Sequence, residues 1–168
     1  MPNEKDEGFV RHILQVCARS KGDAAHLRRA DSDQETDKPW QILATFNLDL
    51  TNREAILPYI TVMSAIARSE ARYSGTLNIG AALAKSFKDA AKNEQAQARL
   101  RRLLACDSLL DLTQVLRPML ALINSRGVRG LDYVQMLRDL KGFRYDDSRS
   151  RTKARWAGGF FGIVEDVA

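Results

Sequence analysis

Apolar residues recur at spacings of three and four positions along nearly the whole chain, which is the period of an α-helix that buries one face. Near the N-terminus this spacing joins Phe9, Ile13, Val16 and Cys17 into one stripe. A longer stripe in residues 51–73 consists of Ile56, Tyr59, Ile60, Met63, Ile66 and Ala67. We find no alternating run long enough for a half-buried strand and no hairpin turn signal. The pattern therefore predicts an all-α fold, a two-lobed bundle of about eight to nine helices.

Residues that commonly cap helices predict where the helical segments begin. The expected caps are Asp23, Asp37, Thr51, Asp107 or Ser108, Asp132 and Ser148. Trp40 and Leu43 should face inward from the segment that follows Asp37. Pro58 lies inside a longer segment, which it should kink or restart because it removes one backbone donor, and Pro118 should kink a second one.

Small residues followed by polar sequence mark the middle of the chain. The glycine and alanines of the segment NIGAALA would let another backbone approach closely. The sequence then turns polar over residues 85–95, where we expect the hinge between the lobes. The predicted division is an N-terminal helical lobe, residues 1–90, and a C-terminal helical lobe with a basic surface, residues 91–168.

The segment SRSRTKARWAGGFF, near the C-terminus, has a basic residue at every second position before it turns apolar. Residues four apart lie on the same side of a helix, so Arg149 and Lys153 share one side. Arg151 and Arg155 share another side, nearly opposite to the first. The apolar stripe that begins at Trp156 continues the side of Lys153, whose stem should pack while its ammonium reaches water. We therefore expect Arg151 and Arg155 to point away from the core and to be free to meet a partner.

The composition is that of an ordinary globular protein. Hydrophobic residues make up 45% of the 168 residues and charged residues 28%. No apolar run reaches the roughly 18 residues that cross a bilayer, and the polar N-terminus MPNEKDEG is unlike a secretory signal. Cys17 and Cys106 lie far apart, with no second Cys or His at a metal-ligand spacing, so neither a disulfide framework nor a zinc site is indicated. We expect a cytoplasmic protein.

Positive charge is concentrated in one part of the chain. The formal net charge is +5, yet residues 99–156 hold 13 of the 26 Lys and Arg and only 6 of the 21 Asp and Glu. Such a concentration is typical of a surface that meets polyanions such as nucleic acid. The alternative is a basic solvated face without a partner.

The residue types that catalyse reactions do not form a recognisable set. His12 and His26 stand in no metal-ligand motif, and Asp146 with Asp147 suits helix termination better than two-metal catalysis. The segment INSRGVRG has two glycines but lacks the Gly-Lys-Ser/Thr ending of a P-loop. No nucleophile stands in a pattern with a base. The sequence therefore provides no positive reason to expect an enzyme, a cofactor or a metal.

Arginines on helix faces are the feature that points to a function. In the segment ARLRRLLACD the leucines share the core side, so Arg99 and Arg102 lie along a neighbouring edge and Arg101 projects further out. A guanidinium donates two parallel hydrogen bonds to a phosphate, and a packed helix lowers the cost of ordering it. The alternative is an ion pair with Asp107, Asp111 or a carboxylate of the other lobe. Further candidate pairs are Arg126 with Arg129 and Arg28 with Arg29.

Six segments, in order along the chain, resemble the CasB family, the small subunit of the type I-E CRISPR surveillance complex called Cascade. They are GDAAHLRRA, PWQIL, NIGAALA, ARLRRLLACD, VRGLDYVQMLRDL and RWAGGFF. The similarity runs from about residue 22 to residue 161. Each segment alone is weakly specific, and the match rests on their order and spacing.

This resemblance implies a two-lobed, all-helical protein without catalytic activity. In this family two copies usually pack head to tail in the complex, against the backbone subunits that hold the guide RNA. Their basic surfaces help to hold the target DNA strand and to guide the displaced strand of the R-loop. The implied partners are therefore the backbone and large subunits of Cascade with their guide RNA, both DNA strands and a second copy of the chain, with no membrane.

Individual residues follow from the resemblance by matching position. It assigns nucleic-acid contact to Arg28, Arg29, Arg53, Arg101 and Arg102, and structural roles to Trp156 and Phe160. The family often has a basic residue directly after the glycine of the small-residue segment, where this chain has Ala81, and Lys85 is the candidate replacement. The full set of candidate contacts is Arg28, Arg29, Arg53, Lys85, Arg99, Arg101, Arg102, Arg126, Arg129, Arg151 and Arg155.

Two other functions fit a basic helical protein. A freestanding DNA-binding regulator would present a recognition helix, for which the segment QMLRDLKGF offers Gln135, Arg138 and Lys141. A structural helical adaptor would instead turn its basic face to an acidic protein. Footprinting on a defined operator would support the regulator, and co-purification that survives nuclease treatment would support the adaptor.

Overall fold

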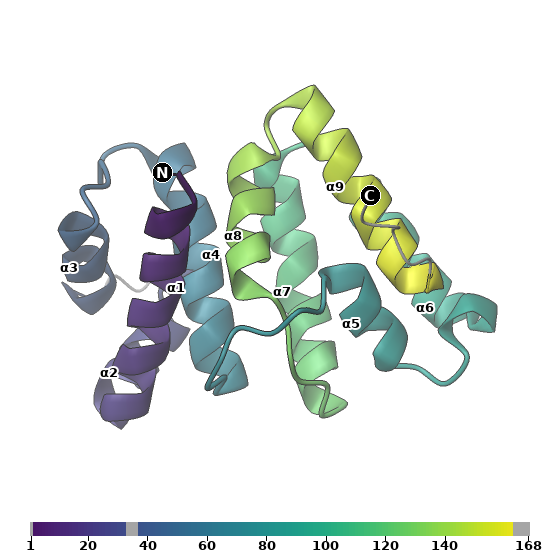
Figure 1. The fold of residues 1–168 in the computed structure, drawn as a ribbon, viewed down its shortest axis with the longest axis horizontal. Coiled ribbons are helices and arrows are strands. Elements are labelled where there is room, and N and C mark those ends of the chain that lie inside the picture. Colours follow the sequence, from purple (N-terminus) through teal and green to yellow (C-terminus); the bar gives the residue numbers. More distant parts are fainter. Residues whose placement is uncertain (1, 33–36, 163–168) are drawn as a thin grey trace. The chain divides into compact units, whose positions relative to one another are not determined.

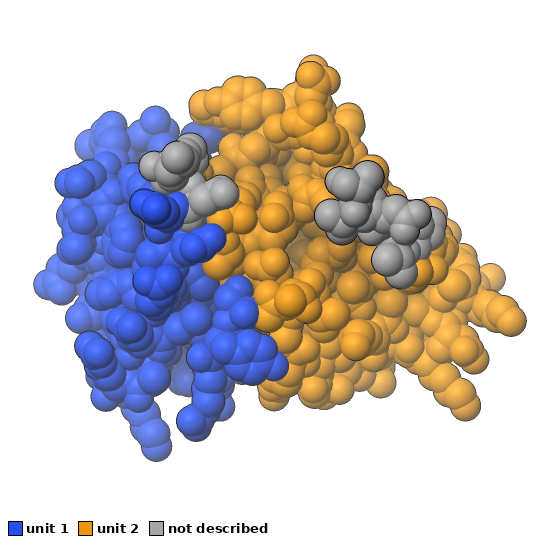
Figure 2. Space-filling model, in the orientation of Figure 1, with its two compact units in different colours: residues 1–74 blue, residues 75–168 orange. Residues whose placement is uncertain are grey.

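The computed structural model describes residues 2–32 and 37–162, and over these ranges the protein is helical, as the periodicity predicts (Figure 1). The chain divides into two compact units, Met1–Ser74 and Gly75–Ala168, which Figure 2 distinguishes by colour. The described ranges contain α-helices α1 to α9, one short 3₁₀ helix, η1, and no strand longer than one isolated bridge.

The first unit consists of α1 (Pro2–Arg19), α2 (Lys21–Arg28), α3 (Asp37–Thr45) and α4 (Arg53–Ser69). Its fully buried side chains come from all four helices and include Phe9, Ile13, Leu27, Leu43, Met63 and Ile66. The ring of Phe9 makes T-shaped contacts with the rings of Phe46 and Tyr59, with centroid distances of 5.2 and 4.9 Å. The predicted stripes therefore form this core, and α4 continues past Pro58 without interruption.

Three helix starts in the first unit differ from those expected, and one of them is that of α3, in which Asp37 is the first helical residue and not the cap. Ser20, rather than Asp23, caps α2, because its Oγ accepts a hydrogen bond from the Asp23 backbone N–H at 3.1 Å. Asn52, rather than Thr51, caps α4, and the hydroxyl of Thr51 donates to Asp49 at 2.6 Å instead. Ser, Thr, Asp and Asn are nearly equal as caps, so the sequence offered neighbouring alternatives.

Trp40 is a second departure in this unit. We expected it to face inward, but its side chain is 45% exposed, whereas Pro39, Ile42 and Leu43 are buried. The helix α3 thus turns its proline, not its tryptophan, towards the core. Residues 33–36, in the acidic run before α3, lie outside the described ranges.

The second unit consists of α5 (Ile79–Lys85), η1 (Ala90–Lys92), α6 (Glu94–Leu104), α7 (Leu109–Ser125), α8 (Tyr133–Gly142) and α9 (Asp146–Phe161). Ser108 and Asp132 cap α7 and α8, as predicted. Ser148 does not cap α9, which begins at Asp146. The carboxylates of Asp146 and Asp147 lie in the first turn, where they interact favourably with the positive end of the helix dipole.

Helices α5 and α9 pack with their backbones in close contact (Figure 1). A Cβ atom added at Gly80 would overlap the backbone carbonyl of Trp156. A Cβ added at Gly159 would overlap the side chain of Asn78, whose Nδ2 donates to the Arg155 carbonyl at 3.1 Å. The close approach predicted for the small-residue segment is therefore confirmed, and its partner is the C-terminal helix.

The boundary between the units lies earlier in the chain than the expected position after residue 90. Residues 75–90 belong to the second unit because α5 packs on α9 and because the stretch before it pairs with residues 130–132. The Gly75 and Leu77 N–H groups donate to the carbonyls of Leu131 and Gly130, at 2.8 and 2.9 Å. This pairing is too short to leave an alternating pattern in the sequence.

Candidate nucleic-acid interface

Helix α6 holds two exposed arginines on a packed support. Asn93 caps the helix by accepting hydrogen bonds from the N–H groups of Gln95 and Ala96 at 2.9 and 3.1 Å. Leu100 and Leu103 are buried beneath it, as the helical period predicts. Arg101 and Arg102 are exposed. Burial of the leucines fixes the direction in which both arginines leave the helix.

No hydrogen bond or ion pair occupies the guanidinium of Arg101 or Arg102 within residues 2–32 and 37–162. Asp107, the nearest expected partner in sequence, instead accepts a hydrogen bond from Lys153 Nζ at 3.0 Å. The Lys153 ammonium holds the pKa of the Asp107 carboxyl below its usual range. The alternative for Arg101 and Arg102, an ion pair within the protein, is therefore not observed among the described residues.

Phe87 brings together two candidate arginines that lie far apart in the sequence. The guanidinium carbon of Arg99, on α6, lies 5.7 Å from the ring centroid, and that of Arg126, which follows α7, lies 5.8 Å from it. Cation–π contact offsets part of the repulsion between the two charges. An anion bound beside them would offset more, so this cluster is a candidate phosphate site. Nothing in the sequence indicated that Phe87 would join them.

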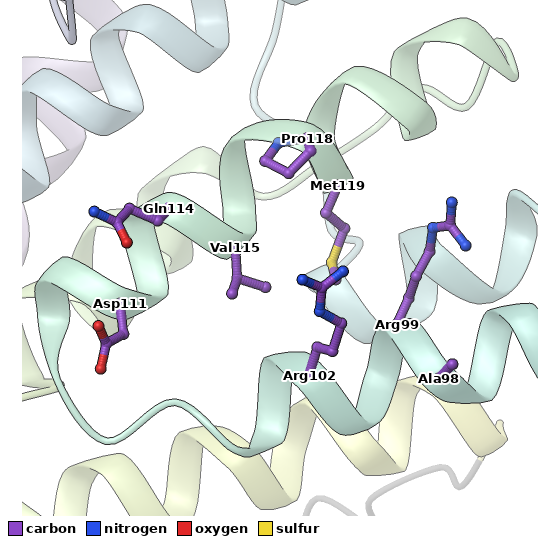
Figure 3. Close-up of a pocket in the computed structure, with 8 residues that line it drawn as sticks. All are labelled: Ala98, Arg99, Arg102, Asp111, Gln114, Val115, Pro118 and Met119. Atoms are coloured by element: carbon purple, nitrogen blue, oxygen red, sulfur yellow. The ribbon is translucent and has the colours of Figure 1, made fainter.

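A groove between α6 and α7 extends from this cluster (Figure 3). Its volume is about 540 Å³, and it is lined by Ala98, Arg99, Arg102, Asp111, Gln114, Val115, Pro118 and Met119. Arg102 and Met119 point towards each other across the groove, while Asp111 and Gln114 lie at its other end (Figure 3). Sequence reasoning placed Arg99 and Arg102 on one edge of a helix but missed the apolar wall that faces them.

Arg155 is held by the protein, contrary to expectation. Its guanidinium donates to Asp139 Oδ1 at 2.7 Å and to Thr152 Oγ1 at 3.1 Å. Asp139 lies on α8 and is only 3% exposed at its side chain, against 30% for Arg155. The expectation that Arg155 points away from the core was wrong because the buried acid comes from another helix. Arg151 is exposed and has no such partner among the described residues.

The other side of α9 carries structural cations, as predicted from the position of its apolar stripe. Arg149 donates to the Phe143 carbonyl at 3.2 Å and to Asp146 at 2.7 Å. Lys153 reaches Asp107, and both cations lie 6.0 Å from the ring centroid of Phe143. Trp156 is buried on this side of the helix. Arg149 and Lys153 therefore hold α9 against other parts of its own unit.

The first unit contributes a smaller set of exposed arginines. Arg28 is engaged, because its Nε donates to the Ala67 carbonyl at 3.2 Å and its terminal nitrogen lies 3.3 Å from Glu70 Oε1. Arg29, directly after α2, and Arg53, the first residue of α4, are exposed without a side-chain partner in the described part of the chain. Arg28 thus joins α2 to α4, whereas Arg29 and Arg53 remain available to contact a partner molecule.

Two further candidates lie at the ends of helices in the second unit. Lys85 is exposed at the end of α5, one turn after the half-buried Ala81. Arg129 is exposed beyond α7 and donates to the neighbouring Val128 carbonyl at 3.3 Å. Between Arg126 and Arg129 the chain turns at Gly127, whose φ of 73° favours glycine.

The described residues contain no group of three or more His, Cys, Asp and Glu side chains that could hold a metal ion. Burial raises the pKa of both cysteine thiols, Cys17 and Cys106, and so disfavours the reactive thiolate. No helix within residues 2–32 and 37–162 is long and apolar enough to cross a membrane.

Comparisons with known proteins agree on one family. The model of the family described as CRISPR-associated protein Cse2 matches residues 23–161. Among solved structures, CasB of M. ruber is 22% identical over 94% of this chain and 93% of that one, with a TM-score of 0.72. CasB of Thermobifida fusca is 18% identical, over 93% and 97%, with a TM-score of 0.74. The Cse2-family CRISPR-associated protein of Thermus thermophilus is 20% identical, over 94% and 97%, with a TM-score of 0.73. None of the curated protein sequences matched the chain.

Proposed function

The chain belongs to the family of the CRISPR-associated protein Cse2, and we propose that it is a non-catalytic small subunit of a type I-E Cascade surveillance complex. In that role it binds nucleic acid without sequence preference and stabilises the R-loop during antiviral defence. Its partners are the backbone and large subunits with their guide RNA, the two DNA strands and a second copy of itself.

The observation that carries this proposal is the pair of exposed arginines on α6. Arg101 and Arg102 are held in fixed directions by buried leucines, and no described carboxylate neutralises them. A guanidinium so placed binds phosphate through two parallel hydrogen bonds at a small ordering cost. The Arg99 and Arg126 pair on Phe87 adds positive charge in the same unit.

Backbone contacts of this kind suit R-loop stabilisation. The heteroduplex that forms is about as stable as the DNA duplex that it replaces, so modest protein contacts to a displaced strand tip the balance. Phosphate contacts carry no sequence information, which such a subunit does not need because base pairing with the guide RNA reads the target.

The interpretation of α8 as a DNA-recognition helix finds no support in its side chains. Gln135 donates to the buried Asp139 at 2.8 Å, and Arg138 and Lys141 are half-buried. Met136 and Leu137 fill the core beneath them. The polar residues that would have to read base edges are therefore turned largely to the protein itself.

Replacing Arg101 and Arg102 together with alanine tests the proposal in the assembled complex. We expect the lifetime of the R-loop to fall by at least about tenfold, which corresponds to about 1.4 kcal/mol. The helicity of the protein should be unchanged, because both side chains are exposed and without partners in the described structure. The lifetime is measured by challenging labelled R-loops with competitor DNA, and helicity by circular dichroism.

A matched control removes the same charge from another exposed helix. Arg11 and Arg19 lie exposed on α1, outside the candidate set, and the variant with alanine at both should keep the normal lifetime. An unchanged lifetime in the α6 variant, with all subunits still assembled, would favour the adaptor function instead. A loss of helicity in that variant would show that the arginines are structural.

A further inference from the structure

The groove between α6 and α7 has an apolar floor, which phosphate binding alone does not require. Val115, Pro118 and Met119 form this floor on α7, and Ala98 faces them from α6. Met119 is buried at its base, Val115 is half-buried and Pro118 is exposed (Figure 3). The volume of about 540 Å³ is that of a small-molecule site.

Positive charge lines the α6 side of the same groove. The guanidinium of Arg102 points across it towards Met119 (Figure 3) and has no partner within the described residues. Arg99 lies one turn from Arg102 on α6. Arg99 and Arg126 both contact the ring of Phe87, so the positive charge extends from Arg102 to Arg126. A planar guanidinium stacks on flat π-systems as well as binding anions. The occupant should therefore combine a flat apolar body with a negative group.

The far end of the groove is polar and carries the opposite charge. Gln114 supplies an amide that both donates and accepts hydrogen bonds, so it can meet the edge of any base. The carboxylate of Asp111 disfavours a second anion at this end. A polyanion lying along the whole groove, or an acidic peptide, would meet this repulsion, whereas a nucleotide with its phosphate at the arginine end would not.

We propose that this groove takes one nucleotide of single-stranded DNA, an inference that rests on the proposed function. The base lies against the floor of Val115, Pro118 and Met119 and beneath the guanidinium of Arg102. The adjoining phosphate lies at Arg99. Single-stranded DNA is the occupant because the displaced strand of an R-loop offers unstacked bases, whereas the bases of a duplex are stacked and cannot enter.

The consequence is a binding contribution from bases, added to that from phosphates. Placing a base on a stacking surface is worth about 1–3 kcal/mol in single-strand binding proteins, which is about fivefold to more than a hundredfold in affinity. The groove therefore predicts that the isolated protein prefers a strand with bases to an abasic strand of equal length and charge. It also predicts a preference for single strands over duplex.

Fluorescence anisotropy at low salt tests this with labelled strands of about 20 nucleotides, longer than the site of a single binding domain. We expect the wild-type chain to bind a mixed-sequence DNA strand about tenfold more tightly than a strand whose central nucleotides are abasic. Val115→Phe fills the groove and leaves every arginine in place, so it should remove this difference while keeping the affinity for the abasic strand. Ala121→Phe, on an exposed position of α7 outside the groove, is the matched control and should keep the difference.

A second variant keeps the test sharp if Val115→Phe folds poorly. Arg102→Lys retains the charge but lacks the planar face and the two parallel hydrogen bonds to phosphate, so it should weaken binding of the strand with bases more than that of the abasic strand and so reduce the difference between them. Equal affinity of the wild-type chain for both strands would overturn the groove proposal and leave the proposed function standing. No binding of either strand would overturn both. Tighter binding of an RNA strand of the same sequence would overturn the assignment to DNA.

Discussion

Replacing Gly80 with alanine is expected to lower the free energy of unfolding of the second unit by about 3 kcal/mol or more. The added Cβ would overlap the backbone carbonyl of Trp156, and a backbone atom cannot move aside as a flexible side chain can. Overpacking a well-packed core typically costs about 1–3 kcal/mol, and separation of α5 from α9 would also expose Trp156 and Phe160. Urea unfolding followed by tryptophan fluorescence measures the change.

Gly8→Ala is the matched control for this substitution. Gly8 lies within α1, and no atom beyond its own helix backbone and chain neighbours would lie within 4 Å of a Cβ there. Alanine is the better helix former by about 0.8–1 kcal/mol, so this variant should be as stable as the wild-type chain or more so. If both variants unfolded at the wild-type urea concentration, the close packing of α5 on α9 would be contradicted.

Arg155→Ala is expected to lower the free energy of unfolding by about 2–3 kcal/mol. The substitution leaves Asp139, 3% exposed, without the guanidinium that lies 2.7 Å away. Breaking a buried ion pair from one side costs about 3–5 kcal/mol, and the 30% exposure of Arg155 places this pair below that range because water screens it. Gln135 and Thr152 also donate hydrogen bonds to Asp139, and these bonds would offset only part of the loss.

Arg151→Ala removes the same charge from the same helix at an exposed position. The free energy of unfolding of this variant should stay within about 0.5 kcal/mol of the wild-type value, because the Arg151 side chain has no partner within the described residues. Chemical denaturation of the two variants side by side makes the comparison. Equal stabilities would show that Arg155 is not needed to neutralise Asp139.

The helical period of the sequence was enough to predict the fold class and most core positions. The stripe from Ile56 to Ala67 lies inward on α4, with Ile60 half-buried. Leu100 and Leu103 likewise lie beneath α6, which is why Arg101 and Arg102 emerge where expected. These features depend on residues three or four apart, which a single sequence displays directly.

Features that depend on contacts between distant segments were not predictable in this way. The position of the unit boundary depends on the packing of α5 against α9, far along the chain. The orientation of Arg155 depends on a buried acid of α8, and the pairing of Arg99 with Arg126 depends on the ring of Phe87. A helical wheel places a side chain on a face but does not identify what lies opposite it.

The salt dependence of binding to single-stranded DNA tests the central claim most directly. Each phosphate contact on a single strand contributes a slope of about −0.7 to the plot of log affinity against log salt. With Arg99, Arg101, Arg102 and Arg126 as contacts, the account predicts a slope of roughly −2 to −3 that is the same for strands of unrelated sequence. Binding that is strongly sequence-selective and insensitive to salt would contradict it.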